Sequence, residues 1–186
     1  VCNMSLAALA AYACGVPAEL IAETLSAPDI APPGRLEPFG LPNGARAFVD
    51  YAHTDDALFR VLTAIRAFCK GRIITVFGCG GDRDKLKRPI MGRIARELAD
   101  RAVVTDDNPR TEDAAEIRRQ ILCECPDAAE IGDRVEAINY AVSRLGEGDM
   151  LVIAGKGHEN GQKIGDRIIP MNDLEEAAKA IARLSR

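Results

Sequence analysis

The chain has 186 residues, which is enough for one domain of ordinary size and part of a second. Its formal net charge is −4 and its lysines and arginines form no concentrated basic stripe, which argues against nucleic acid as a partner. No apolar stretch reaches the length of a membrane span, and the N-terminus lacks the basic start of a secretory signal. We therefore expect a cytoplasmic protein with no membrane partner, whose six cysteines are reduced thiols.

The first segment of the chain is rich in alanine and leucine at helical spacing, and Gly15-Val16-Pro17 divides it into two helices. A proline-rich stretch with the composition of an interdomain linker follows. The chain starts at Val1 without an initiator methionine, which leads us to expect a truncated or excised chain. We predict that residues 1–30 are the helical tail and linker of a preceding domain and that residues 31–186 form a domain of their own.

After the proline-rich stretch, apolar strands alternate with amphipathic helices. Asn43-Gly44 between two extended runs predicts a hairpin, and a second small hairpin is expected at 163–169. The further strands are predicted at 72–77, 101–105, 128–131 and 149–154, and the helices at 54–68, 88–98, 112–122, from 133 and from 172. Such alternation is typical of an α/β fold with a mostly parallel sheet and helices on both faces.

Polar loops follow four of the predicted strands. They comprise Asp50–Thr54, Gly78–Lys85, Thr105–Arg110 and Ala154–Glu159. In an α/β sheet the carboxyl ends of parallel strands lie at one edge, where ligands bind. Because four chemically unusual loops would converge there, the sequence predicts a ligand site at this edge.

The loop Thr105–Arg110 has the most distinctive chemistry. Pro109 stiffens it by fixing its φ, while Asp107, Asn108 and Arg110 offer a carboxylate, an amide and a guanidinium. Arginine binds carboxylates through two parallel hydrogen bonds, and aspartate accepts hydrogen bonds from ammonium groups. The loop therefore suits a ligand that has both an amine and a carboxylate. Taken alone, it is equally well explained as a polar turn with a solvated ion pair.

Two other loop features allow more than one interpretation. Gly78-Cys79-Gly80-Gly81 fits neither the dinucleotide-binding spacing nor a P-loop, and tight turns that need positive φ are the alternative to a ligand role for its glycines. The two histidines, His53 and His158, both lie in strand-end loops, which favours a role near a phosphate or a carboxylate. The sequence shows no nucleophile arrangement and no carboxylates at metal-ligand spacing, so we assign no catalytic residue and no metal ligand to this chain.

Five segments, taken in order, match the pattern of a known family. They are Asp50-Tyr51-Ala52-His53-Thr54, Gly78-Cys79-Gly80-Gly81-Asp82-Arg83-Asp84, Lys87-Arg88-Pro89, Asp107-Asn108-Pro109-Arg110 and Gly155-Lys156-Gly157-His158-Glu159. With this set the chain resembles the Mur ligases, and within them the members that use meso-diaminopimelate. The segments extend across nearly the whole chain, and the ordered set is far more specific than any single loop.

The resemblance implies an enzyme of three domains: a UDP-substrate domain, a central ATPase domain with a P-loop, and a Rossmann-like C-terminal domain. This chain resembles the helical end of the central domain, in which Asn3 lies, followed by the whole C-terminal domain. The P-loop, a carbamylated lysine and most magnesium ligands would lie outside it. ATP and Mg²⁺ would therefore be bound mainly by the central domain, and this chain alone is expected to be inactive.

The reaction implied by the resemblance is ATP-dependent formation of a peptide bond in peptidoglycan precursor synthesis. ATP phosphorylates the D-glutamate γ-carboxylate of UDP-N-acetylmuramoyl-L-alanyl-D-glutamate, and an amine of meso-diaminopimelate attacks the acyl phosphate. The role of the C-terminal domain in this reaction is to hold the amino acid and present its amine.

Individual roles also follow from the resemblance. The residues implied to hold diaminopimelate are Arg83, Asp107, Asn108, Arg110, Gly155 and Glu159, with the arginines on carboxylates and the acidic residues on the distal ammonium. The residues implied to face ATP are Asn3, Arg35, Asp50 and His53. Of these, Arg35 and His53 would contact phosphates, and Asp50 the ribose or adenine side.

Two positions depart from the family pattern. Asp55 stands where a proline is usual, and Gly161 where a tyrosine is usual, which puts the start of one helix and the packing beside the amino-acid site in question. The alternatives are a non-catalytic Rossmann-like module that binds an amino acid, a related Mur or folylpolyglutamate-type ligase, and a domain without a ligand. The Asp-Asn-Pro-Arg loop argues against the related ligases, and the convergent loops argue against the absence of a ligand.

Overall fold

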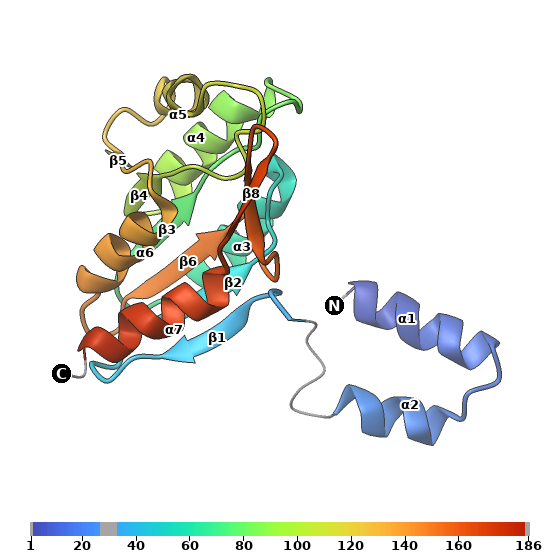
Figure 1. The fold of residues 1–186 in the computed structure, drawn as a ribbon. Helices are drawn as coiled ribbons and strands as arrows, with labels where there is room; N and C mark the ends of the chain where they lie inside the picture. Colours follow the sequence, from blue (N-terminus) through green and yellow to red (C-terminus); the bar gives the residue numbers. More distant parts are fainter. Residues whose placement is uncertain (1, 27–32, 185–186) are drawn as a thin grey trace. The chain divides into compact units, whose positions relative to one another are not determined.

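The computed structural model describes residues 2–26 and 33–184 (Figure 1). Its contacts separate the chain into two compact units, Val1–Pro32 and Pro33–Arg186. Most of the proline-rich stretch predicted as a linker lies outside the described residues, and so does the side chain of Asn3.

The first unit is a pair of helices, α1 (Cys2–Ala13) and α2 (Ala18–Leu25). Gly15 between them has a φ of 88°, a left-handed conformation that glycine adopts without steric cost. Its backbone N–H donates to the carbonyl of Tyr12, so α1 ends in a glycine-dependent turn as predicted.

The second unit is built on a six-stranded sheet. The strands are β1 (Glu37–Gly40), β2 (Arg46–Asp50), β3 (Ile73–Phe77), β4 (Arg101–Val104), β5 (Ala129–Glu130) and β6 (Met150–Ala154). Their order is β1-β2-β6-β3-β4-β5, and every neighbouring pair is parallel except β1 with β2. Strand β6 comes late in the chain yet lies between β2 and β3, with Met150 beside both Arg46 and Ile73.

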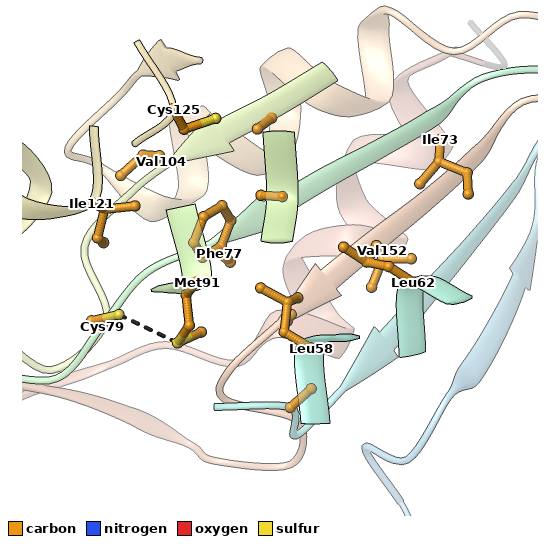
Figure 2. Packing of buried hydrophobic residues seen from close by; sticks show 14 of the residues in the cluster. Leu58, Leu62, Ile73, Phe77, Cys79, Met91, Val104, Ile121, Cys125 and Val152 are labelled. Atoms are coloured by element: carbon orange, nitrogen blue, oxygen red, sulfur yellow. Dashed lines mark hydrogen bonds between the residues drawn. The ribbon is translucent and has the colours of Figure 1, made fainter. Parts of the chain in front are cut away.

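Helices cover both faces of this sheet (Figure 1). Those on one face are α3 (Asp55–Arg66), α4 (Lys87–Leu98) and α5 (Ala114–Leu122), and those on the other are α6 (Arg134–Ser143) and α7 (Asp173–Leu184). Along β3, Ile73 and Phe77 pack against α3–α5 (Figure 2), whereas Ile74 and Val76 pack against α6 and α7. Both cores are apolar, and the predicted Rossmann-like α/β architecture is confirmed.

Side-chain caps begin most of the helices where the sequence predicts them. The capping residues of α3, α6 and α7 are Thr54, Asp133 and Asn172. Asp55, at the position where the family pattern has proline, is the first residue of α3, where an acidic side chain interacts favourably with the helix dipole. Helix α5 begins at Ala114 instead of residue 112, because Asp113 caps it and Glu112 forms an ion pair with Arg88.

A separate two-stranded hairpin, β7 (Gly161–Ile164) and β8 (Arg167–Pro170), follows β6 and turns at Gly165. A Cβ atom at Gly161 would come within 2.6 Å of Ile168 Cγ2, so a side chain at this departure from the family pattern would require the exposed Ile168 side chain to move. The hairpin also forms a parallel bridge between Ile164 and Arg110, which places it against the loop that follows β4.

Candidate functional site

The loops after β2, β3, β4 and β6 lie along one edge of the sheet because these strands are parallel. Across that edge the order of the loops is β2, β6, β3 and β4. The loop after β6 thus lies between the loop after β2 and the loop after β3, at the point where the chain direction across the sheet reverses. Ligands of open α/β sheets commonly bind at such a point.

Asp107 and Asn108 follow β4 and are buried, each 8% exposed. Asn108 Nδ2 donates a hydrogen bond to Glu159 Oε2 at 3.1 Å, and Asn108 Oδ1 accepts one from the backbone N–H of Lys163 at 2.8 Å. Gln162 Nε2 donates to the backbone carbonyl of Asp107 at 2.6 Å. The loop after β4 is therefore joined through polar contacts to the loop after β6 and to strand β7.

The carboxylate of Asp107 has one oxygen engaged and one available. Its Oδ1 accepts a hydrogen bond from the backbone N–H of Asn108 at 2.7 Å, while Oδ2 has no such partner among the described residues. A Cβ atom at Gly155 would come within 3.0 Å of Oδ2, and Gly155 has a φ of 120°. Glycine adopts this φ without steric cost, and a side chain there would crowd Asp107 Oδ2.

The glycine-rich loop after β3 packs backbone to backbone on the loop after β4. Positive φ is the wrong explanation for its glycines, since the φ angles of Gly78, Gly80 and Gly81 all lie outside that region. The loops instead leave no room for side chains: a Cβ atom would lie 2.2 Å from Thr105 O at Gly78 and 1.9 Å from Pro109 O at Gly81. Glycine is used here for close approach.

Arg110 is held in a left-handed conformation with a φ of 53°, which is uncommon for a residue with a side chain. The hairpin stabilises it, because Arg110 N–H donates to Lys163 O at 3.0 Å and Arg110 O accepts from Gly165 N–H at 2.7 Å. Its Nη1 donates to Gly81 O at 2.8 Å, so the guanidinium lies against the glycine-rich loop. An uncommon backbone conformation secured in this way is typical of functional sites.

Arg83 is not brought into contact with the other five residues expected to hold the amino acid. It is exposed, and its Nη1 donates to the carbonyl of Asp82 at 3.0 Å. The loop that carries it is nevertheless well anchored: Asp82 Oδ1 accepts from Thr111 Oγ1 at 2.7 Å, and Asp82 N–H donates to Glu112 Oε1 at 2.6 Å. The position of the loop is fixed, and the Arg83 guanidinium stays in solvent.

A buried arginine supports this anchor. Arg88 is 0% exposed and donates to both carboxylate oxygens of Glu112, at 2.9 and 3.0 Å, and to Gly80 O at 3.2 Å. Hydrogen bonding to Arg88 lowers the pKa of Glu112 to about 2. Arg88 and Glu112 thus connect α4 to both the glycine-rich loop and the beginning of α5.

A second group of expected residues lies at the end of β2. The guanidinium of Arg35 lies over the ring of Tyr51, 4.8 Å from its centroid. The same ring has the imidazole of His53 at 4.7 Å and that of His158 at 5.7 Å. The structure therefore gathers one guanidinium and two exposed imidazoles around a tyrosine, a composition that suits an anionic ligand.

Asp50 ends strand β2, and its carboxylate accepts hydrogen bonds from two backbone N–H groups. Its Oδ2 accepts from Leu36 N–H and its Oδ1 from Ala52 N–H, both at 2.8 Å. Burial raises the pKa of the Asp50 carboxyl, and the two backbone hydrogen bonds oppose this increase. Both carboxylate oxygens hold the loop in place, in contrast to the exposed His53.

Sequence reasoning gave no role to Tyr51, Lys156, Gln162 or Arg134. Lys156 is fully buried beside Glu159, and its position between two glycines of a strand-end loop was an available signal. Arg134 is 2% exposed and forms a bidentate ion pair with Asp173 at 2.7 and 2.8 Å. An arginine directly after the helix cap Asp133 is common on a surface, so its burial had no local signal.

A cavity of about 580 Å³ lies away from these loops, at the amino ends of β3 and β4, so cavity size does not locate the candidate site. Within residues 2–26 and 33–184 no group of three His, Cys, Asp or Glu side chains could hold a metal ion. No helix in the same ranges is long and apolar enough to cross a bilayer, and the described cysteine side chains are free thiols.

The protein-family model described as the Mur ligase, glutamate ligase domain matches residues 34–157 of this chain. The chain belongs to this family. The UDP-N-acetylmuramoyl-L-alanyl-D-glutamate–2,6-diaminopimelate ligase of Agrobacterium fabrum is 54% identical over 185 residues, which are 99% of this chain and 38% of that protein. The ligase of the same name from Alkalilimnicola ehrlichii is 48% identical over 182 residues, 96% of this chain and 36% of that protein.

Solved Mur ligase structures show the same fold. A UDP-N-acetylmuramoyl-L-alanyl-D-glutamate–2,6-diaminopimelate ligase matches with a TM-score of 0.79 at 36% identity, covering 97% of this chain and 37% of that one. The UDP-N-acetylmuramate–alanine ligase of Thermotoga maritima matches with a TM-score of 0.66 at 16% identity, which supports the fold alone. This Mur ligase chain thus spans 36–38% of the length of the relatives described above.

Proposed function

We propose that this chain is the amino-acid-binding part of an ATP-dependent ligase that adds meso-diaminopimelate to UDP-N-acetylmuramoyl-L-alanyl-D-glutamate in the cytoplasm. The observation that carries the proposal is the contact between two strand-end loops, in which Asn108 binds Glu159 while Asp107 and Arg110 lie on the same loop as Asn108. The names of the relatives at 48–54% identity support the choice of substrate.

The chemistry of the loops suits a doubly zwitterionic amino acid. Meso-diaminopimelate has two ammonium groups and two carboxylates. In this proposal Asp107 Oδ2 and Glu159 accept hydrogen bonds from the distal ammonium, and Gly155 leaves the space for it. Arg110 and the exposed Arg83 bind the carboxylates, for which a guanidinium is well suited. L-Lysine lacks one carboxylate and would leave an arginine unpaired, so the site discriminates against it.

The contribution of the chain to the reaction is positional. Transfer of the ATP γ-phosphoryl group to the D-glutamate γ-carboxylate gives an acyl phosphate and ADP. The amine of the bound amino acid attacks the acyl carbon, phosphate leaves with the electron pair of the broken C–O bond, and the nitrogen loses its proton to form the amide. Holding the amine in place turns this attack into an effectively intramolecular step.

In the same proposal the group at the end of β2 faces ATP. Arg35 and His53 are exposed next to Tyr51 and would bind phosphate oxygens, whereas Asp50 would act by shaping its loop on the ribose or adenine side. Asn3 would face the nucleotide from the helical segment. As the family resemblance implies, Mg²⁺ is assigned in this proposal mainly to the central ATPase domain of the family.

Calorimetry with the 186-residue chain tests the amino-acid site. We expect binding of meso-diaminopimelate that is weak because only this part of the site is present, with L-lysine bound more weakly still. Replacing Arg110 with alanine should lower the affinity about tenfold or more, since a charged hydrogen bond contributes about 1.5–3 kcal/mol. Equal affinities for the two amino acids, or no effect of Arg110→Ala, would contradict the proposal.

A phosphate-release assay tests the assignment of the catalytic groups. The chain alone, given ATP, Mg²⁺ and both substrates, should release no phosphate. A chimera in which this chain replaces the matching 38% of the Agrobacterium fabrum ligase should release phosphate only when meso-diaminopimelate is present. Phosphate release by the isolated chain would show that the phosphoryl-transfer machinery is here after all.

A further inference from the structure

Lys156 lies in the loop after β6 and is fully buried. Its ammonium group has three hydrogen-bond acceptors around it. Its Nζ donates to Asn108 Oδ1 at 3.0 Å, to Glu159 Oε2 at 3.1 Å and to Gly161 O at 2.8 Å. An ammonium group has three hydrogens, so its donor capacity is used in full. No hydrogen of Lys156 is left for a ligand, which means that any influence on binding acts through its neighbours.

The first neighbour is Asn108, whose amide could in principle be turned either way. Its Oδ1 accepts from both Lys156 Nζ and Lys163 N–H, and its Nδ2 donates to Glu159 Oε2. These contacts distinguish the oxygen from the nitrogen, because a flipped amide would point two N–H groups at two donors. One N–H of Asn108 then remains as a donor with a fixed direction.

The second neighbour is Glu159, whose side chain is 34% exposed although Lys156 is 0% exposed. Its Oε2 accepts from both Asn108 Nδ2 and Lys156 Nζ, whereas its Oε1 has no described partner. A surface glutamate ordinarily samples several rotamers. Here one oxygen is fixed from inside the protein, and the other is left as an oriented acceptor.

Lys156 also compensates the charge of this loop. A buried ammonium is costly unless it is paired and fully hydrogen-bonded, and Lys156 meets both conditions through Glu159, Asn108 and Gly161. If Glu159 turned away into solvent, the Lys156 ammonium would be buried without its paired charge, and most of the free-energy cost of burying it would return. The ion pair therefore favours the conformation in which Asn108 and Glu159 are both directed to the ligand side.

We propose that Lys156 is a positioning residue that orients the amide of Asn108 and the carboxylate of Glu159, and so determines selectivity among amino acids at this site. The selectivity part depends on the proposed function, whereas the orientation part does not. Without the ammonium group, the Asn108 amide keeps only the contacts with Lys163 N–H and Glu159, and Glu159 Oε2 loses one of its two donors, so both side chains are held less firmly. The site would then still carry its charges but would no longer present them in one arrangement.

The first experiment needs no ligand. In NMR spectra of the 186-residue chain, the Asn108 side-chain amide should show slow hydrogen exchange and contacts to Glu159. Both signs should be lost in Lys156→Met and kept in Lys70→Met, in which the replaced lysine is exposed at the amino end of β3. An Asn108 amide that is unchanged in a folded Lys156→Met protein would overturn the proposal.

A measurement on the unmodified chain keeps the proposal testable if Lys156→Met does not fold. The ammonium hydrogens of Lys156 should exchange with water far more slowly than those of Lys70, because all three are held inside the protein. Equally fast exchange at the two lysines would show that the buried contacts are absent in solution.

The second experiment measures selectivity in the chimeric ligase. Lys156→Met should raise KM for meso-diaminopimelate at least tenfold and narrow its preference over L-lysine, with little change in KM for ATP. Lys70→Met should alter none of these. If the unmodified chimera uses both amino acids equally, the proposed function fails. If it prefers meso-diaminopimelate and Lys156→Met keeps that preference, only the role of Lys156 fails.

Discussion

The loops at the functional edge of the sheet fall into two groups that are held in different ways. Those after β3, β4 and β6 are fixed to one another from inside the protein, by close backbone contact at Gly81 and by the buried side chains of Asn108 and Lys156. The loop after β2 presents its chemistry on exposed side chains, His53 and the neighbouring Arg35. The polar side chains of the first group are held by buried contacts, whereas those of the second lie exposed around the ring of Tyr51.

This difference has an energetic meaning. A ligand that binds oriented groups does not have to order them, so more of the contact energy appears as affinity. Exposed long side chains lose rotamer freedom when they bind, at a cost of up to about 2 kcal/mol each. We therefore expect changes in the interior supports of the first group to affect both stability and amino-acid binding, and changes near β2 to affect the fold little.

The largest effect is expected at the ion pair beneath the β6 loop. Arg134 donates to both oxygens of Asp173 and, through Nη2, to Ala154 O at 2.9 Å, and both side chains are almost fully buried. Asp173→Asn leaves the guanidinium buried without its counter-charge, so the free energy of unfolding should fall by about 3–5 kcal/mol. Urea unfolding followed by circular dichroism measures this change.

The matched control is Asp166→Asn at the exposed turn between β7 and β8. Its free energy of unfolding should stay within about 0.5 kcal/mol of the wild-type value. If Asp173→Asn is equally mild, the support of the β6 loop does not depend on this ion pair, and the proposed contrast between the two groups of loops weakens.

The next effect concerns the contact between the glycine-rich loop and the loop after β4. Gly81→Ala would place a methyl group 1.9 Å from Pro109 O, so one of the two loops must move. Overpacking of this kind costs about 1–3 kcal/mol of unfolding free energy. The affinity for meso-diaminopimelate should fall as well, because Arg110 bonds to the carbonyl of Gly81.

Gly40→Ala in β1 provides the comparison, since a Cβ atom there meets nothing within 4 Å. Calorimetry and chemical unfolding of the two variants separate a local clash from a general intolerance of alanine. Loss of stability without loss of amino-acid affinity in Gly81→Ala would mean that the two loops do not shape the site together.

The meeting of these loops could be predicted from the order of elements alone. Asn108 and Glu159 are 51 positions apart, yet they touch because β4 and β6 both run parallel to β3, one on each side of it. Apolar runs bounded by turn residues are enough to place the ends of such strands at one edge. The convergence of loops and the helix caps are therefore properties of hydrophobic pattern and turn chemistry, which a single sequence displays.

The orientation of individual side chains at that edge could not be predicted. Lys156 is fully buried between Gly155 and Gly157, which both adopt positive φ, and although the flanking glycines mark an unusual loop they do not show that the lysine points inward. The glycines after β3 serve close packing against Thr105 and Pro109, which depends on a loop elsewhere in the sequence. Contacts of this kind arise only when the sheet has formed.

The smallest expected effect concerns pH, and it contrasts one carboxyl from each group of loops. Hydrogen bonding to Arg88 lowers the pKa of Glu112 to about 2, so between this value and its ordinary pKa the unfolded chain binds more protons. Its stabilising contribution is present above its ordinary pKa and is lost as the pH falls toward 2. Burial raises the pKa of Asp50, so between its ordinary pKa and this raised pKa the folded chain binds more protons than the unfolded chain. The contribution of Asp50 to stability therefore declines as the pH rises from the ordinary pKa to the raised one.

Glu112→Gln and Asp50→Asn should therefore change the pH dependence of the unfolding free energy in opposite directions. Relative to the wild-type chain, stability in Glu112→Gln should fall less on acidification below about pH 4.5, the ordinary pKa of a glutamate. In Asp50→Asn the decline with rising pH contributed by this carboxyl should disappear, so the wild-type curve and the variant curve diverge above the ordinary pKa of aspartate. Urea titrations at a series of pH values measure both. Parallel curves for the two variants would show that the interior supports and the β2 loop do not differ in how they hold a carboxylate.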